Sequence, residues 1–290
     1  MSPRSSTAVE GSNSAYQRID VRPLSGAVGA EILGVDLNRL DEPTFQEIHR
    51  AFLEHLVIFF RDQSITPEVH KAFARRFGEL RVSDQYVPLA GHPEILEIVK
   101  EPDSTGIVGN LWHCDESFKE RPALGSMLYM IECPPVGGDT MFANQYLAYE
   151  TLSAGMKKLL AGLRAVYSDA SLGERNYGRA LKLLPGAADR PGSSAVHPVV
   201  ITHPQTGRKA LYVHRPYTVC FEDMTPQESE PMLTQLFAHA SRPEVTCRFR
   251  WQPGSLAFWD NRCVQHYALN DYSGVRRYAH RVTIVGDVPR

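Results

Sequence analysis

The stretch SMLYMIECPPVGGDTMFA, residues 126–143, contains two short β-rich runs with a turn between them. The runs are residues 126–131 and 139–143, and the PPVGG segment that separates them has the proline and glycine content of a turn. Similar runs follow at residues 199–202, 209–213, 245–251, 255–259 and 278–285. Many short strands without regular βα alternation predict a mainly β fold, a sandwich or jelly roll with flanking helices.

Helices are expected around this β-rich part of the chain. Asp41 is a good N-cap for a helix whose apolar residues recur at helical spacing from Phe45 to Leu53. Thr66, followed by a proline, opens a second helix that Gly78 closes. Two more helices are predicted at 153–163 and 225–240, and further strands at 19–24, 31–37, 57–60 and 96–99.

The composition is that of an ordinary globular protein. Of the 290 residues, 43% are hydrophobic and 22% are charged, without clustering of either kind. No interdomain linker is evident, so we expect a single domain over residues 19–290, preceded by a flexible polar tail at 1–18. Residues 172–195, rich in Gly, Arg, Ser and Pro, are predicted to form a mobile lid within that domain.

Charge and hydropathy exclude two classes of partner. The chain has 31 Lys and Arg against 33 Asp and Glu, and its net charge of -2 provides no basic field for a nucleic-acid backbone. Its apolar runs fall far short of the roughly 20 residues that cross a bilayer. The polar N-terminus lacks the apolar core of a signal peptide. We therefore expect a cytoplasmic protein that binds neither nucleic acid nor membrane.

The segment LWHCDESF, residues 111–118, places His113 and Asp115 two residues apart. In an extended segment these side chains point to one face and can share a metal ion. The pair alone is weak evidence in a chain with eleven histidines, where a structural histidine is the commoner explanation. A non-haem Fe(II) site needs a second imidazole, and His266 is the most informative candidate. On spacing alone three alternatives remain: His197, His203 and His214.

Two arginines stand four residues apart in a segment whose β-branched residues predict a strand. At the period of a strand, Arg277 and Arg281 face the same side. Two guanidinium groups on one inward face require anions, because a buried unpaired charge is costly. The alternative is a solvated edge strand.

Five motifs are spread along the chain: FGEL at 77–80, WHCD at 112–115, GGDT at 137–140, WDNRCVQH at 259–266 and HRVTIVGD at 280–287. Together they resemble the taurine dioxygenase and 2,4-dichlorophenoxyacetate dioxygenase family of Fe(II)/2-oxoglutarate-dependent oxygenases. The resemblance covers nearly everything from Ile19 to Asp287, and the motifs are far more specific jointly than singly.

This resemblance implies a double-stranded β-helix, a cupin-like jelly roll, and assigns roles to matching positions. His113, Asp115 and His266 would be the catalytic triad that binds Fe(II). Arg277 would pair with the C5 carboxylate of 2-oxoglutarate, and Thr140 would supply a hydroxyl partner to the same group. An arginine suits the binding of a carboxylate because its planar guanidinium group can donate two parallel hydrogen bonds to it. The implied cofactors are Fe(II), 2-oxoglutarate as cosubstrate, and O2.

The substrate half of the site departs from the taurine-oxidising members. Arg281 matches the residue that holds the substrate anion in sulfonate-using members, but Ser83 stands where they carry a substrate-binding histidine. Tyr86 is retained, and Asn110, beside a glycine, is the nearest match to their asparagine. Phe118 resembles the aromatic residue that packs on the substrate, with plain core packing as the alternative. These five residues are the predicted substrate contacts, and taurine itself is not expected to be the substrate.

The predicted activity is hydroxylation of a small organic anion, with succinate and CO2 as coproducts, followed by C–S or C–O cleavage where the hydroxylated carbon bears sulfur or oxygen. Alkyl sulfonates or sulfate esters, aryloxyalkanoates, and amino-acid or other carboxylate natural-product precursors remain open. An alternative from another class is a non-catalytic, metal-containing β-sandwich binding protein, which would have no use for Arg277 and Thr140. Because the family often forms dimers or tetramers, a homo-oligomer is also expected.

Overall fold

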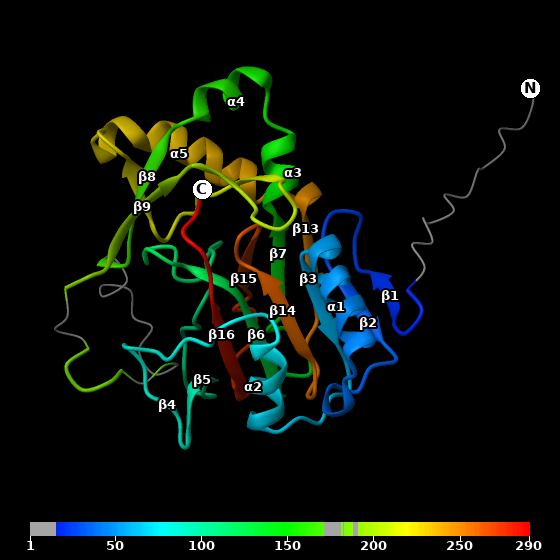
Figure 1. Ribbon diagram of the computed structural model, residues 1–290. Helices are drawn as coiled ribbons and strands as arrows, with labels where there is room; N and C mark the ends of the chain where they lie inside the picture. The colour runs from blue at the N-terminus through cyan, green and yellow to red at the C-terminus, as the bar shows by residue number, and fades with distance from the viewer. Residues whose placement is uncertain (1–15, 171–180, 182, 188–190) are drawn as a thin grey trace, which may run out of the picture.

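The computed structural model describes residues 16–170, 181, 183–187 and 191–290 (Figure 1). Its strands are β1 (Asp20–Pro23), β2 (Ala30–Leu33), β3 (Val57–Phe60), β4 (Pro88–Leu89), β5 (His92–Lys100), β6 (Ala123–Glu132), β7 (Thr140–Asn144), β8 (Arg164–Ser168), β9 (Ser194–Pro198), β10 (Val200–Thr202), β11 (Lys209–Leu211), β12 (Thr218–Phe221), β13 (Thr246–Phe249), β14 (Leu256–Asp260), β15 (Val264–Ala268) and β16 (Arg277–Val285). Its helices are α1 (Glu42–His55), α2 (Pro67–Arg75), α3 (Gln145–Glu150), α4 (Ala154–Leu160) and α5 (Pro226–Ala240), with short 3-10 turns η1 (Leu37–Arg39) and η4 (Pro243–Val245).

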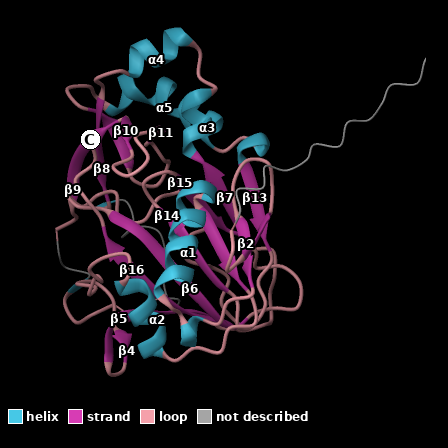
Figure 2. Cartoon of the chain, turned by 45° about the vertical axis from the view of Figure 1, so that its right-hand side comes forward, coloured by secondary structure: helices cyan, strands magenta, loops and turns pink. Residues whose placement is uncertain are grey.

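An eight-stranded sheet, ordered β1-β2-β3-β14-β6-β16-β5-β4, is the largest element of the fold. Its neighbouring strands are antiparallel except for β2 and β3, which run parallel. Helices α1 and α2 lie along one face of this sheet (Figure 2). A second sheet, ordered β13-β7-β15, faces the other side. The two facing sheets form the jelly roll, which confirms the predicted mainly β fold with flanking helices.

Alternation along the strands divides the apolar residues of the large sheet between two cores. On β6, Leu128 and Met130 face the second sheet, while Met127 packs toward α1 and α2. The strand β14 alternates in the same way, with Trp259 in the first core and Phe258 in the second. Successive side chains of a strand point to opposite faces, so one pleat builds both cores. The candidate site lies on the face toward the second sheet.

Capping residues define where the helices begin. The Asp41 carboxylate accepts a hydrogen bond from the Thr44 backbone N–H (2.9 Å) at the start of α1. Thr66 caps α2 with a proline at its first position, and Thr225 forms a capping box with Glu228 at the start of α5. These N-termini confirm the sequence predictions. None of the helices in the described part of the chain is long and apolar enough to span a membrane.

Several elements differ from the sequence predictions. The predicted strand 31–37 ends at Leu33, and residues 37–39 form a 3-10 turn capped by Asp36. Residues 264–268, for which no strand was predicted, form the strand β15. The predictions also lacked β8, β9 and β12, a small separate sheet ordered β12-β8-β9 whose short segments carry little alternation of their own. Tertiary pairing decides such segments more than local propensity does.

Two predicted segments lie partly outside the described residues. Of the lid at 172–195, only residues 181, 183–187 and 191–195 are described, and 194–195 begin β9. Of the tail at 1–18, residues 16–18 are described. There the backbone N–H groups of Gln17 and Arg18 donate to the Glu47 carboxylate on α1 (2.8 and 2.9 Å).

Candidate functional site

His113 and His266 face each other across an antiparallel bridge. The backbone N–H of each residue donates to the carbonyl of the other, at 3.1 and 2.9 Å. His266 lies in the middle of β15, and the bridge adds the segment around His113 to that strand's free edge. The ring centroids are 4.1 Å apart. Backbone pairing therefore brings together two imidazoles from distant parts of the chain.

Asp115 reaches the same point through a turn rather than along a strand. We expected His113 and Asp115 in one extended segment, but the chain turns directly after the bridge, and Glu116 has φ +55°. The Asp115 Oδ1 atom lies 3.8 Å from the Nε2 atom of each histidine. All three side chains are buried. One imidazole nitrogen from each histidine and one carboxylate oxygen thus lie within 4.8 Å of one another.

The protonation states suit a metal ion. Burial lowers the pKa of both His113 and His266, so their rings are neutral at pH 7. The His113 Nδ1–H donates to the Leu111 carbonyl (2.6 Å), which leaves the Nε2 lone pair free for a ligand. Burial alone would raise the pKa of Asp115, but the two imidazoles and Arg281 outweigh it and hold that pKa well below its usual range. Neutral imidazoles with an ionised carboxylate are the forms that bind a divalent cation.

The other candidate histidines do not converge on Asp115. The Nε2 atom of His197 lies 3.0 Å from the Lys119 carbonyl, and His214 is surrounded by tyrosine rings. His203 forms a second buried cluster with Asp260 and Cys263. Its Nδ1 accepts two backbone N–H groups, so Nε2 carries the hydrogen that Asp260 accepts (3.0 Å). This second cluster therefore offers no free imidazole lone pair to a metal.

The carboxylate of Asp260 is in addition paired with Arg262. The guanidinium donates to both carboxylate oxygens, with Nε to Oδ1 at 2.8 Å and Nη2 to Oδ2 at 2.6 Å. Such a bidentate pair satisfies the carboxylate without a cation. Of the histidines left open by spacing, His266 is the one that the fold brings to Asp115.

A cavity beside the three residues has the features of a carboxylate site. Arg277 and Thr140 line it, together with Trp251 and His266. Arg277 is 3% exposed, and its Nε has no hydrogen-bond partner within the described residues. Burial lowers its pKa, so an arriving anion relieves an unfavourable charge. The Thr140 hydroxyl accepts from the Trp251 Nε1–H (2.9 Å), which leaves its own hydrogen to donate to a ligand.

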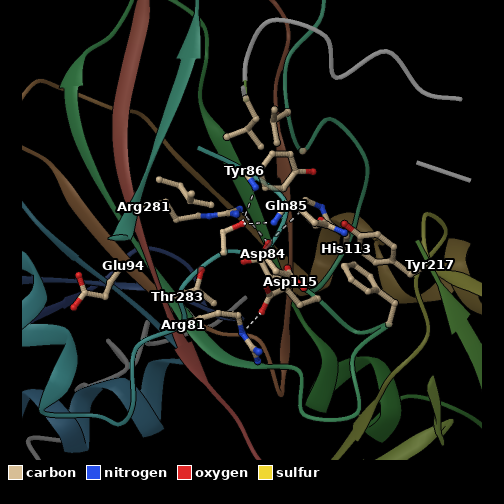
Figure 3. Close-up of a pocket in the computed structure, with 17 residues that line it drawn as sticks. Arg81, Asp84, Gln85, Tyr86, Glu94, His113, Asp115, Tyr217, Arg281 and Thr283 are labelled. Carbon is tan, nitrogen blue, oxygen red and sulfur yellow. Dashed lines mark hydrogen bonds and ion pairs between the residues drawn. The ribbon is translucent and has the colours of Figure 1, made fainter. Parts of the chain in front are cut away.

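A second cavity opens on the other side of His113 and Asp115 (Figure 3). Ser83, Tyr86, Phe118 and Arg281 all line it. Figure 3 shows Arg281 reaching from β16 toward Asp115, and their Nη1 and Oδ1 atoms are 3.5 Å apart. We call this cavity the outer chamber. Arg281 also borders the inner cavity of Arg277, as expected for two residues on one face of a strand.

Gly109, rather than its neighbour Asn110, lines both cavities. Its φ is +83°, and a Cβ built on it would lie 3.2 Å from the His113 Cε1 atom. A side chain at this position would therefore be strained and would crowd the imidazole. Asn110 is half-buried next to the lining, so its predicted contact with substrate stays a prediction.

Ion pairs balance most of the charges of the outer chamber. Its acidic residues other than Asp115 pair as follows: Glu116 with Arg81 (2.7 Å), Asp84 with Lys119 (3.3 Å), and Glu94 with Arg75 (2.6 Å) and Lys71 (3.6 Å). Arg281 differs because its acidic partner, Asp115, is one of the three converging groups that could hold a metal ion. A cation at that position would compete for Asp115 and leave Arg281 available for an anion.

Sequence reasoning missed the residues that support the site. Ser126 and Asn261 both contact the Asp115 carboxylate, and Arg81 pairs with Glu116 in the outer chamber. Asn261 lies within the WDNRCVQH motif, so the motif itself was a signal for its importance. Ser126 carried no such signal, because a serine in a β-rich run resembles any other strand position.

Comparisons with known proteins agree with this geometry. The family described as taurine catabolism dioxygenase TauD, TfdA family matches residues 20–283. An alkylsulfatase of Acinetobacter baylyi is 35% identical, over 94% of this chain and 86% of its own. An alpha-ketoglutarate-dependent sulfate ester dioxygenase of Pseudomonas putida is 36% identical, over 93% of this chain and 91% of its own. The crystal structure of a taurine dioxygenase from Burkholderia xenovorans superposes with a TM-score of 0.80 at 38% identity, over 94% of this chain and 92% of its own.

The match covers nearly the whole chain, and the non-catalytic binding protein considered above is not favoured. The sulfate ester dioxygenase is by its name dependent on α-ketoglutarate, that is 2-oxoglutarate, and the residues present fit both an Fe(II) ion and a dicarboxylate. The chain belongs to the TauD/TfdA family and is a non-haem Fe(II)- and 2-oxoglutarate-dependent dioxygenase.

Proposed function

We propose that His113, Asp115 and His266 hold the Fe(II), and that Arg277 and Thr140 bind the far carboxylate of 2-oxoglutarate in the inner cavity. When bound, the iron with 2-oxoglutarate and O2 supplies an oxidant that hydroxylates a C–H bond, with succinate and CO2 as coproducts. The unpartnered Nε of buried Arg277 supports the cosubstrate assignment. The metal assignment is supported by the convergence of the two histidines on Asp115, since the Nε2 atoms of His113 and His266 each lie 3.8 Å from the Asp115 Oδ1 atom.

The residues of the chain orient these groups and exclude water. Trp251 holds the Thr140 hydroxyl, and Trp259 packs against the His266 ring with centroids 4.7 Å apart. Rigid aromatic neighbours keep each ligand in one rotamer, which preserves the arrangement that the reaction needs. Burial of all three metal-binding residues removes competing water ligands.

The proposed substrate is an alkyl sulfate ester, bound in the outer chamber with its anionic head at Arg281. The observation that carries this proposal is the charge balance of the chamber, in which Arg281 is the cation whose acidic partner is a proposed metal ligand. Both relatives cited above bear names that refer to sulfate esters or alkyl sulfates. Hydroxylation of the carbon next to the ester oxygen gives an unstable product that collapses to an aldehyde and inorganic sulfate.

The rest of the chamber fits an apolar substrate body better than an ammonium group. Leu96, Val108, Phe118 and Leu181 line it. The acidic residues that could bind an ammonium already have arginine or lysine partners. Taurine would therefore leave its charged amine facing apolar surface, whereas an alkyl chain buries there favourably. An aryloxyalkanoate would also place an apolar body in this space and is the competing class.

Initial rates of succinate formation test this choice. Hexyl sulfate is expected to exceed taurine by at least about tenfold in specificity constant, equivalent to roughly 1.4 kcal/mol of differential transition-state binding. A phenoxypropionate measured in parallel separates the sulfate ester from the aryloxyalkanoate class. If taurine proved the best of the three, the proposed chamber chemistry would be wrong.

Three further proposals concern the domain, the cellular compartment and the oligomeric state of the protein. We propose a single catalytic domain over residues 19–290, since β1 near one end and β16 near the other share one sheet. We also propose a cytoplasmic homo-oligomer, a dimer or tetramer, on the resemblance to the family. Light scattering of the purified protein measures the oligomeric state, and a monomer would contradict that part.

A further inference from the structure

The two oxygens of Asp115 have different surroundings. Oδ1 faces the Nε2 atoms of the two histidines, at 3.8 Å each. Oδ2 points away from them, where it accepts a hydrogen bond from the Ser126 hydroxyl (2.7 Å) and a longer one from the Asn261 Nδ2 (3.4 Å). Ser126 is fully buried and Asn261 is 1% exposed. The carboxylate is thus hydrogen-bonded by buried protein donors on Oδ2, whereas Oδ1 faces the two imidazoles and, at 3.5 Å, the Arg281 Nη1 atom.

The hydrogen-bond network leaves little freedom in how these donors are oriented. The Asn261 Oδ1 accepts from the Asp115 backbone N–H (3.0 Å) and from the Trp259 Nε1–H (3.1 Å). Two donors on this oxygen fix the orientation of the amide and turn its NH2 toward Asp115 and Ser126. The Asn261 NH2 also donates to the Ser126 oxygen (3.3 Å), so the serine hydrogen is directed to Asp115.

Both donors stand on rigid parts of the fold. Ser126 lies on β6 between β14 and β16, paired with Trp259 on one side and Thr283 on the other. Asn261 lies in the turn after β14, between Asp260 and Arg262, whose bidentate ion pair closes that turn. A displacement of either donor would have to disturb the large sheet or a buried ion pair.

The number of coordination positions on an iron ion suggests what this hydrogen bonding does. Two imidazoles and one carboxylate oxygen would fill three of six positions on an Fe(II) ion, a chelating 2-oxoglutarate would fill two more, and one position would have to stay free for O2. A carboxylate that bound through both oxygens would fill that position. We propose that Ser126 and Asn261 are positioning residues that keep Asp115 monodentate and so preserve the open position. This inference rests on the proposed metal assignment.

Ser126→Ala is the direct test, with Ser255→Ala as a matched control. Ser255, directly before β14, is also a fully buried serine, but its hydroxyl contacts the Arg61 guanidinium and the Gln252 backbone N–H. X-ray absorption of the anaerobic Fe(II) protein distinguishes a carboxylate bound through both oxygens, because its carbon atom then lies closer to the iron than in a carboxylate bound through one oxygen. We expect this shorter iron–carbon distance in Ser126→Ala but not in wild type or the control. We also expect the reaction of its Fe(II)/2-oxoglutarate complex with O2, followed by stopped flow, to slow at least about tenfold.

Asn261→Ala serves as the second variant and should show the same effects, and circular dichroism verifies that each variant is folded. A wild-type iron–carbon distance together with wild-type O2 reactivity in both variants would overturn the proposal. So would loss of Fe(II) binding from a folded Ser126→Ala protein, because the hydroxyl would then be needed for binding itself. Absence of Fe(II) binding in wild type would instead refute the metal assignment on which the proposal rests.

Discussion

At the scale of single residues, burial distinguishes the two arginines of β16 that we propose bind different ligands. Arg277 is 3% exposed in the inner cavity, whereas Arg281 lies between that cavity and the outer chamber. An even-numbered spacing of two, four or six along a strand keeps side chains on one face, so a single strand presents both arginines to neighbouring cavities. The two charges lie at different depths, which makes their effects on the two ligands separable by mutation.

Arg277→Ala is expected to weaken 2-oxoglutarate binding by roughly 2 to 4 kcal/mol, the scale for losing one partner of a desolvated charge pair. Substrate affinity should change much less. Arg276→Ala is the matched control, because that neighbouring side chain pairs with Glu101 and Glu132 outside the cavity. Isothermal titration of 2-oxoglutarate into each anaerobic variant measures its affinity for the cosubstrate. Equal affinities in wild type and Arg277→Ala would show that another cation binds the cosubstrate.

Arg281→Gln should act on the other ligand. The substitution removes the cation proposed to meet the sulfate head but keeps an uncharged polar side chain, which is shorter than that of arginine. We expect the KM for hexyl sulfate to rise by about 30-fold or more, on the scale of 2 kcal/mol for a lost charge partner, while the affinity for 2-oxoglutarate changes little. Steady-state kinetics with each ligand varied in turn gives both numbers. A variant with an unchanged KM for hexyl sulfate would remove Arg281 from the substrate site.

At the scale of elements, the alternation of β6, β14 and β16 links the core to the site. Each strand presents apolar residues to α1 and α2 on one face and supplies Ser126, Trp259 or Arg277 to the site on the other. A shift of register by one residue would exchange the two faces. The position of the site is therefore fixed by the same pleat that builds the core.

Helix α2 carries a buried histidine that makes stability depend on pH. Burial lowers the pKa of His70 to about 3, and His280 contributes to the shift. Between the unfolded value near 6.5 and the folded value near 3, the unfolded chain binds a proton that the folded chain does not, so stability falls as pH falls. From pH 7 to pH 5 this residue should cost roughly 2 kcal/mol.

Urea unfolding of wild type and His70→Leu at both pH values checks the expectation. The variant has a side chain of similar volume that cannot take up a proton, so it should lose about 2 kcal/mol less than wild type on acidification. Parallel losses in the two proteins would place the acid sensitivity elsewhere.

Local signals explain which elements the sequence could predict. Asp41, Thr66 and Thr225 cap their helices as expected, because a cap needs only neighbouring residues. The strand β15 and the turn at Asp115 were not predicted. Their conformations depend on pairing with each other across the bridge between His113 and His266, more than 150 residues apart in sequence. Long-range pairing of this kind leaves no local pattern.

At the scale of the whole molecule, two facing sheets enclose a site whose ligands come from separate strands and loops. The triad, the cosubstrate arginine and the threonine were all proposed from sequence, but the spacing of residues left four histidines open for the third metal position. The fold brings His266 to Asp115 and directs His203 to Asp260 instead. The supporting donors on Asp115 became visible only in three dimensions, since their role depends on which oxygen they contact.

The central claim is that His113, Asp115 and His266 bind one Fe(II) per chain. Anaerobic equilibrium dialysis of Fe(II) against wild type, Asp115→Ala and Cys263→Ala tests it most directly, because Cys263 belongs to the second buried cluster. We predict one Fe(II) per chain in wild type and Cys263→Ala, and binding at least about 100-fold weaker in a folded Asp115→Ala protein. Iron retained by Asp115→Ala, or lost from Cys263→Ala, would contradict the assignment.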